Sequence, residues 1–91
     1  MEDLDLTNLR KIIDVLDDEI LSLIAERQIV VSHIGKLKAE NKMAVLDKER
    51  EDFLKEYHKE LSEKYDLSIE FVNQLFEIIM DEARRAQANV H

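Results

Sequence analysis

Apolar residues recur at alternating steps of four and three along the first half of the chain. The series runs through Leu9, Ile13, Leu16, Ile20 and Leu23, then past Arg27 to Val30, Ile34 and Leu37. Such spacing is typical of one apolar face on a continuous amphipathic helix. It predicts a helix from about residue 7 to about residue 41. Thr7 or Asp5 is the expected N-cap, because a short oxygen side chain accepts hydrogen bonds from the free N–H groups there.

Two shorter helices are predicted in the second half. One begins near Asp47 as its N-cap and carries an apolar face of Arg50, Leu54, Tyr57 and Leu61. Residues 64–67 then form a connection, and Ser68 is the expected N-cap of the last helix. That helix carries Val72, Phe76, Ile79, Ala83, Ala86 and Val90 on one face. The pattern therefore predicts an all-α fold with three helices in each chain.

The first helix is too long for a single chain to cover. At about 1.5 Å per residue it measures about 50 Å, whereas a compact chain of this size has a diameter of about 30 Å. Because the apolar face runs along nearly the whole helix, a second copy is the simplest cover, and the pattern predicts an intertwined homodimer. The alternative is a break at Gly35, which would give a monomeric bundle. Within a continuous helix, Gly35 is either a tolerated weak point or a place of close backbone approach.

Composition narrows the possibilities further. The 91 residues include one glycine and no proline or cysteine, and the net charge is −8. We expect one domain over residues 1–91, without disulfides, thiolate chemistry or the many turns of a β-barrel. The acidic charge argues against nucleic acid as a partner. Neither a signal peptide nor a membrane span is indicated, so a cytoplasmic protein is expected. The three histidines have no metal-ligand spacing.

Two arginines interrupt the apolar faces, Arg27 in the first helix and Arg50 in the second. Each forms a salt bridge, reaches to water, or binds an anionic ligand, because an unpaired buried charge is costly. Lys38 follows Arg27 by just over three turns, so both project from nearly the same face about 16 Å apart. Arg10 lies about 25 Å before Arg27 on that helix. Arg10 and Arg27 can therefore bind one small molecule only across an antiparallel dimer.

These residues together resemble a known family, the all-helical class of chorismate mutase. The resemblance rests on Arg10, Ala25-Glu26-Arg27, Lys38, Asp47-x-x-Arg50-Glu51 and Gln87, and it covers about residues 4–90. It implies an intertwined homodimer of three-helix chains with shared active sites. It also implies conversion of chorismate to prephenate in phenylalanine and tyrosine biosynthesis, the shikimate pathway, without metal or cofactor.

The resemblance also implies catalytic and substrate-binding roles for single residues. Arg27 and the Arg10 of the other chain correspond to the residues that bind the two substrate carboxylates. Lys38 corresponds to the cation facing the ether oxygen, and Gln87 to the second donor there. Planar guanidinium groups suit carboxylates, and donors aimed at a developing negative charge suit the ether oxygen.

The remaining roles lie at the start of the second helix. Glu51 corresponds to the acceptor for the ring hydroxyl, with the backbone near Asp47 assisting, and Arg50 supports a carboxylate or the local charges. One position departs from the family: Ala83 stands where some members have a serine near the ring carboxylate. Arg84 beside it has no counterpart in the family pattern and is expected to be a surface residue.

Two other functions remain open from the sequence. An isochorismate-pyruvate lyase shares this fold and a similar cationic pocket, although Glu51 suits the 4-hydroxyl of chorismate better. The other alternative is not an enzyme: it is a dimeric helical interaction module, in which the charges on the apolar faces only pair with one another.

Overall fold

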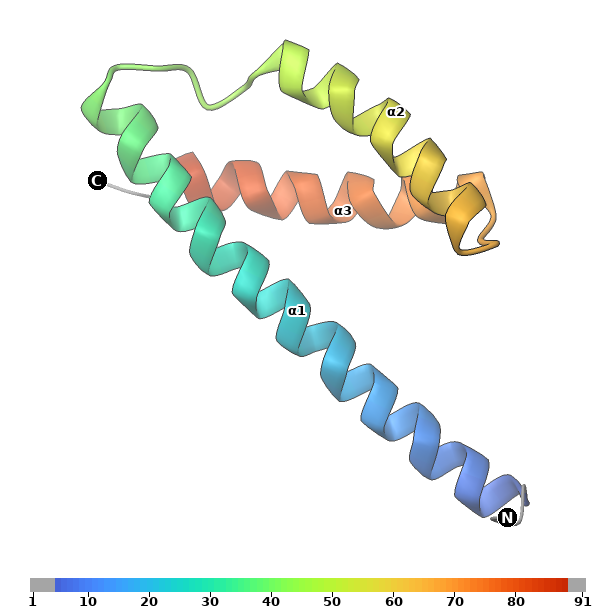
Figure 1. Cartoon of the computed structure of the whole chain (residues 1–91). Coiled ribbons are helices and arrows are strands. Elements are labelled where there is room, and N and C mark those ends of the chain that lie inside the picture. Colours follow the sequence, from blue (N-terminus) through green and yellow to red (C-terminus); the bar gives the residue numbers. More distant parts are fainter. Residues whose placement is uncertain (1–4, 89–91) are drawn as a thin grey trace. The chain divides into compact units, whose positions relative to one another are not determined.

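The computed structural model describes residues 5–88, and within that range all regular secondary structure is helical (Figure 1). Helix α1 spans Leu6–Glu40, α2 spans Lys48–Lys64 and α3 spans Ile69–Ala88. The predicted all-α class and the predicted order of one long and two shorter helices are thus confirmed. Val90, expected on the apolar face of the last helix, lies outside the described residues. No described helix combines the length and apolar character that a membrane span requires.

The chain divides into two units, Met1–Val30 and Val31–His91. The first contains most of α1, and the second contains the end of α1 together with α2 and α3. Helix α1 continues without a break through Gly35, so the alternative of a helix broken at that glycine is wrong. Gly35 and Val31 are the buried residues of α1. Burial of a residue without a side chain fits the close-approach interpretation of Gly35.

Side-chain oxygens cap the start of each helix. Asp5 accepts a hydrogen bond from the Asn8 N–H at 2.8 Å, so Asp5 rather than Thr7 caps α1. The predicted caps of the other helices are confirmed by their contacts: Asp47 accepts from the Arg50 N–H at 3.1 Å, and Ser68 accepts from the Phe71 N–H at 3.2 Å. Each cap satisfies one of the backbone donors that a helix start leaves without a partner.

The ends of α1 and α2 use residues other than glycine in the left-handed conformation. Lys42 and Asp66 both have a φ of 54°. The following residue in each case bonds back to the helix: Met43 N–H to Lys38 O at 2.7 Å, and Leu67 N–H to Ser62 O at 2.8 Å. This is the Schellman arrangement, which turns the chain away from a helix end. The two helix ends therefore form without the glycine that usually occupies this position.

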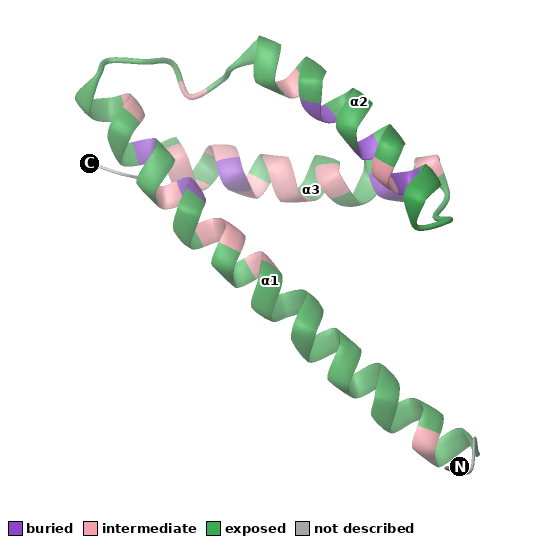
Figure 2. Cartoon of the chain, in the orientation of Figure 1, coloured by how far each residue is buried: buried purple, intermediate pink, exposed green. Residues whose placement is uncertain are grey.

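Helices α2 and α3 pack against each other and form the small core of the second unit. The buried face of α2 consists of Leu54, His58 and Ser62, seen as the purple bands in Figure 2. The predicted face through Tyr57 and Leu61 is therefore wrong by one position, and Tyr57 is 44% exposed. The reason is that a histidine can pack its ring like an aromatic residue: His58 is stacked on Phe76 of α3, with ring centroids 3.7 Å apart.

Removing the cap of α3 tests this account of helix stability. We expect Ser68→Ala to lower the free energy of unfolding by about 1 kcal/mol, the typical value of an N-cap side chain. Urea unfolding at fixed protein concentration measures it. Gln74→Ala, at an exposed site on the same helix, is the control and should lose nothing. An equal loss in both variants would contradict the role of the cap.

The effect of Ser68 should also depend on pH. The backbone N–H of Glu70 and the Ser68 hydroxyl donate to the Glu70 carboxylate, and both hydrogen bonds lower the pKa of Glu70. A carboxyl with a lowered folded-state pKa stabilises the fold above its ordinary pKa, and this contribution is lost as the pH falls through the folded-state value. The stability difference between wild type and Ser68→Ala should therefore shrink below about pH 4.

Candidate functional site

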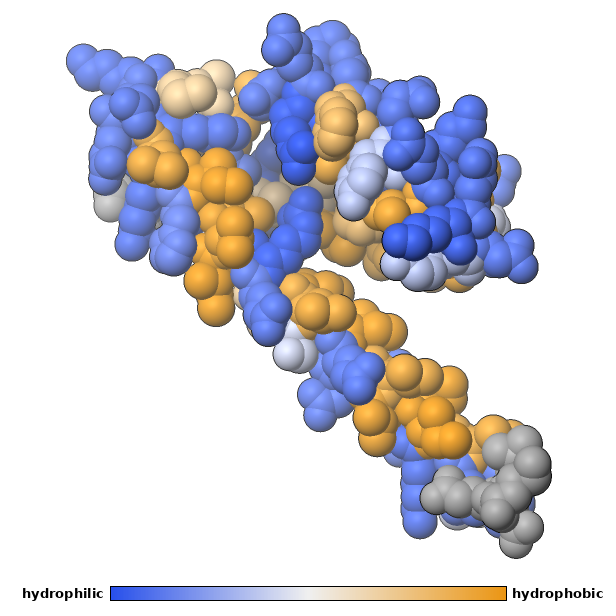
Figure 3. Space-filling view, in the orientation of Figure 1, coloured by the Kyte–Doolittle hydropathy of each residue, from blue (hydrophilic) through white to orange (hydrophobic). Residues whose placement is uncertain are grey.

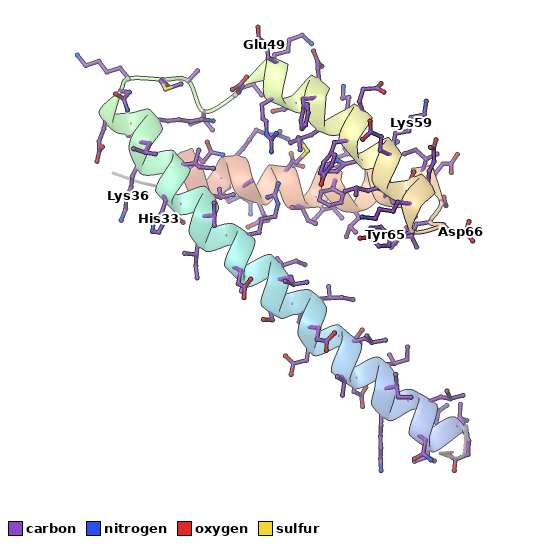
Figure 4. The ribbon with its side chains drawn as sticks, in the orientation of Figure 1. His33, Lys36, Glu49, Lys59, Tyr65 and Asp66 are labelled. Carbon is purple, nitrogen blue, oxygen red and sulfur yellow. The ribbon has the colours of Figure 1, made fainter. Side chains whose placement is uncertain are left out.

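Lys38, the predicted partner of an ether oxygen, lies in the last turn of α1. Its side chain is half-buried, and its Nζ donates to the backbone carbonyl of Val45 at 2.8 Å. The contact ties the connection between α1 and α2 to the end of α1. By contrast, Lys36 and His33 on the same helix are exposed and point away from the connection between α1 and α2 (Figure 4). The Lys38 ammonium is therefore held by one bond and keeps two further N–H donors.

The first turn of α2 brings three of the predicted site residues together. Asp47 caps the helix through the Arg50 N–H. The Arg50 guanidinium lies 5.0 Å from the centre of the Phe53 ring, a cation–π arrangement. Glu51 is half-buried, and its own N–H bonds to the Asp47 carbonyl at 3.0 Å. The helix start thus fixes a carboxylate and a guanidinium on adjacent positions.

Glu51 forms an ion pair with Arg84 across the two helices. Arg84 Nη1 donates to Glu51 Oε2 at 2.9 Å, and the two side chains are 34% and 27% exposed. Arg84 thus keeps about a third of its side chain exposed and also joins two helices, a contact that the sequence did not predict. Its other terminal nitrogen, Nη2, donates to Asp81 one turn earlier on α3. The hydrogen bond that Arg84 donates to Asp81 raises the pKa of Arg84, and the charge of Glu51 raises it further.

A cavity of about 460 Å³ opens between α2 and α3. It lies within the range typical of small-molecule sites. Glu51 and Arg84 line it together with apolar groups from Phe76 and Met80, and His58 lies at its wall. Glu51 is the predicted site residue that lines this cavity; Lys38, Asp47, Arg50 and Gln87 do not belong to its lining.

Gln87, near the end of α3, has a side-chain oxygen in an unusual environment. Its Oε1 is buried and has no hydrogen-bond partner within residues 5–88. Buried polar atoms are rarely left in this state, so the atom calls for a ligand or a water. Rotating the amide by half a turn would place its N–H₂ donor at the same point. Ala83, which replaces a serine of some family members, is buried in the core.

The two arginines that are predicted to bind the substrate carboxylates belong to the first unit. Arg10 is exposed near the start of α1, and Arg27 is half-buried about five turns further along. Most apolar residues of α1 between them are exposed in the single chain, up to 66% for Leu21. Figure 3 shows these side chains following the helix as a row of orange atoms.

Sequence reasoning missed two features of the second unit. The place of Arg84 could not be inferred, because its partner Glu51 lies 33 residues away in the chain. The role of His58 left a weak signal, since it follows Leu54 by four residues and therefore shares its helix face. Tyr57 is more apolar than its neighbour His58, so the apolar pattern placed the predicted face one position too early.

The fold and these side chains define an all-helical protein with a long first helix, cations on its apolar face, and a carboxylate at the first turn of its second helix. Comparison with known proteins agrees with this description. Residues 9–88 match the family described as chorismate mutase type II, and the chain belongs to that family.

Individual relatives carry the same description. The chain is 37% identical over 75 residues to the bifunctional chorismate mutase/prephenate dehydratase of Buchnera aphidicola from Acyrthosiphon pisum, covering 82% of this chain and 20% of that protein. It is 27% identical over 82 residues to the chorismate mutase of Methanocaldococcus jannaschii, covering 90% of this chain and 83% of that protein. The chain thus spans about a fifth of the length of the bifunctional relative.

Proposed function

We propose that this chain catalyses the conversion of chorismate to prephenate, in the biosynthesis of phenylalanine and tyrosine in the cytoplasm. The observation that carries the proposal is the family match over residues 9–88. All the predicted site residues fall within it: Arg10, Arg27, Lys38, Asp47, Arg50, Glu51 and Gln87. The reaction is an intramolecular Claisen rearrangement, in which one C–O bond breaks as one C–C bond forms.

This reaction makes two physical demands on a protein. The enolpyruvyl arm must be folded over the ring so that the two carbon ends meet, because a near-attack geometry removes much of the entropic part of the barrier. The ether oxygen gains negative charge as its bond breaks, so fixed donors aimed at it lower the barrier. No proton transfer is required, which fits a site made of cations and amides rather than an acid–base pair.

Arg27 and the Arg10 of a partner chain are proposed to bind the two carboxylates of the substrate. A guanidinium presents a planar pair of N–H donors that matches a carboxylate. Two such clamps at different ends of the substrate hold the folded arm. The proposal requires a dimer, because Arg10 and Arg27 lie 17 positions apart on one helix, which is about 25 Å.

Lys38 and Gln87 are proposed to face the ether oxygen. The Lys38 ammonium has donors to spare beyond its bond to the Val45 carbonyl. Gln87 Oε1 is buried and has no partner within residues 5–88. In the alternative orientation of the amide its N–H₂ group occupies that point and can donate to a ligand oxygen, which supports the assignment. A charged and a neutral donor together stabilise the charge that develops in the transition state.

Glu51 is proposed to accept the hydrogen bond of the ring hydroxyl, with the backbone at Asp47 beside it. The cap formed by Asp47 fixes the turn on which Glu51 stands. Arg50, one position earlier, adds positive charge near the start of α2. A carboxylate that accepts from a hydroxyl at one ring position discriminates chorismate from an isomer with its hydroxyl elsewhere.

The working form is proposed to be an intertwined homodimer. Helix α1 carries apolar residues that are about half exposed in the single chain: Leu9, Ile13, Leu16, Ile20 and Leu23. Exposed apolar surface of this extent marks an interaction site. A second copy supplies a matching apolar face and also the Arg10 that the first copy needs, so one assembly answers both requirements.

The proposed reaction is tested by incubating the purified chain with chorismate and, separately, with isochorismate. We expect loss of chorismate absorbance and formation of prephenate, identified by chromatography. Formation of salicylate from isochorismate, without prephenate from chorismate, would assign the chain to the lyase reaction. Turnover of neither substrate would favour an interaction module without catalysis.

Replacement of Lys38 tests the ether-oxygen assignment. We expect Lys38→Ala to lower kcat by about 10²–10³-fold, the usual loss when a donor to a developing oxyanion is removed. Lys36→Ala is the matched control, since it removes an exposed lysine from the same helix end, and it should retain wild-type turnover. Near-normal kcat in Lys38→Ala, with circular dichroism confirming the fold, would refute the assignment.

Mixing two inactive variants tests the shared active site. Arg10→Ala and Arg27→Ala should each be strongly impaired as homodimers. When the two are unfolded together and refolded, random pairing gives heterodimers with one intact site each, so about a quarter of the wild-type activity should return. If the mixture is no more active than its components, Arg10 and Arg27 do not act across a dimer.

A further inference from the structure

The ion pair between Glu51 and Arg84 differs from the ion pairs Lys48–Asp52 and Arg85–Glu82. It joins the first turn of α2 to α3 over 33 residues of sequence. The pairs Lys48–Asp52 and Arg85–Glu82 each stay within one helix, and Lys48 is 85% exposed. Exposed pairs within a helix fix little beyond their own side chains. The Glu51–Arg84 pair instead sets the position of a carboxylate relative to a second helix.

Arg84 is itself held at two points. Nη2 donates to Asp81 on the same helix, and Nη1 donates to Glu51 on the other. Because the guanidinium is rigid and planar, fixing one of its nitrogens directs the other. Asp81 therefore orients Arg84, and Arg84 in turn orients Glu51. The hydrogen bond that Arg84 donates to Asp81 also raises the pKa of Arg84, which favours the charged guanidinium.

The pair leaves Glu51 able to bind something else. Arg84 contacts Oε2 of the carboxylate, whereas a carboxylate offers four acceptor sites on its two oxygens. Glu51 and Arg84 both line the cavity between α2 and α3. A ligand hydroxyl can donate to Oε1 without displacing the arginine.

We infer that Arg84 is a positioning residue, which holds the Glu51 carboxylate in place for the ring hydroxyl of the substrate. The inference rests on the proposed function, because it takes the role of Glu51 from there. Arg84 acts through Glu51 and needs no contact of its own with the substrate. A carboxylate displaced by about 1 Å loses much of its effect in a reaction that depends on placement.

A double-mutant cycle on kcat/KM tests the inference. Arg84→Met keeps the length of the side chain and removes the fork. We expect it to lower kcat/KM about tenfold to a hundredfold in the wild-type background. In the Glu51→Ala background the same change should cost nothing further, because no carboxylate remains to be positioned. A structural role would reduce kcat/KM equally in both backgrounds, and that outcome would overturn the inference.

Two further variants complete the design. Arg84→Lys should recover part of the loss, since it retains the charge but not the directed fork. Arg85→Met is the matched control: Arg85 is the next residue on α3 and pairs with Glu82 on the same helix. It should leave kcat/KM unchanged in each of the two backgrounds. A loss in Arg85→Met as large as in Arg84→Met would contradict a specific role of Arg84.

A milder variant decides the question if Arg84→Met does not fold by circular dichroism. Asp81→Asn keeps the shape of the side chain and weakens the bond that directs Arg84. It should lower kcat/KM by severalfold with Glu51 present and not at all in Glu51→Ala. Equal effects in both backgrounds would overturn the inference.

Wild-type protein that does not convert chorismate would refute the proposed function itself, whereas active wild type with a fully active Arg84→Met refutes only the inference.

Discussion

Burial of the apolar face of α1 is the constraint on which the rest of this protein depends. Residues such as Ile13, Ile20 and Leu23 are more than half exposed in the single chain. In the second unit, buried apolar residues such as Leu54 and Val72 contribute to the packing of α2 against α3. On our proposal the partner's α1 covers the first unit, and the same contact delivers Arg10 to the site. Stability and substrate binding then depend on one interface.

The charge distribution follows from that arrangement. The chain carries a net charge of −8, yet the proposed substrate has two carboxylates. Overall charge therefore opposes binding at long range, and salt screens that repulsion beyond about 10 Å. Cations on partly buried positions act at short range, where the dielectric is lower and their attraction is stronger. Arg27 and Lys38 are half-buried, which is the environment that such a role requires.

Local features of the fold could be predicted from the sequence, and tertiary contacts could not. The caps Asp47 and Ser68 were predictable because an N-cap depends on residue type and on its place before an apolar pattern. The choice of His58 over Tyr57 for the buried face depends on Phe76, which stands on another helix. The pair of Glu51 with Arg84 spans 33 residues and left no periodic signal. Residue types suggested the candidate site, whereas the contacts between residues on different helices became visible only in the structure.

The Glu51–Arg84 pair shows how a weak interaction serves a reaction of this kind. A partly exposed ion pair contributes about 0–1 kcal/mol to folding, so stability alone gives little reason for it. A rearrangement without proton transfer gains its rate from placement and from fixed charges. Holding a carboxylate to a fraction of an ångström then matters more than the energy of the contact that holds it. On our proposal, the cap at Asp47 fixes the backbone of Glu51 and Arg84 fixes its side chain, so two modest interactions together define one position.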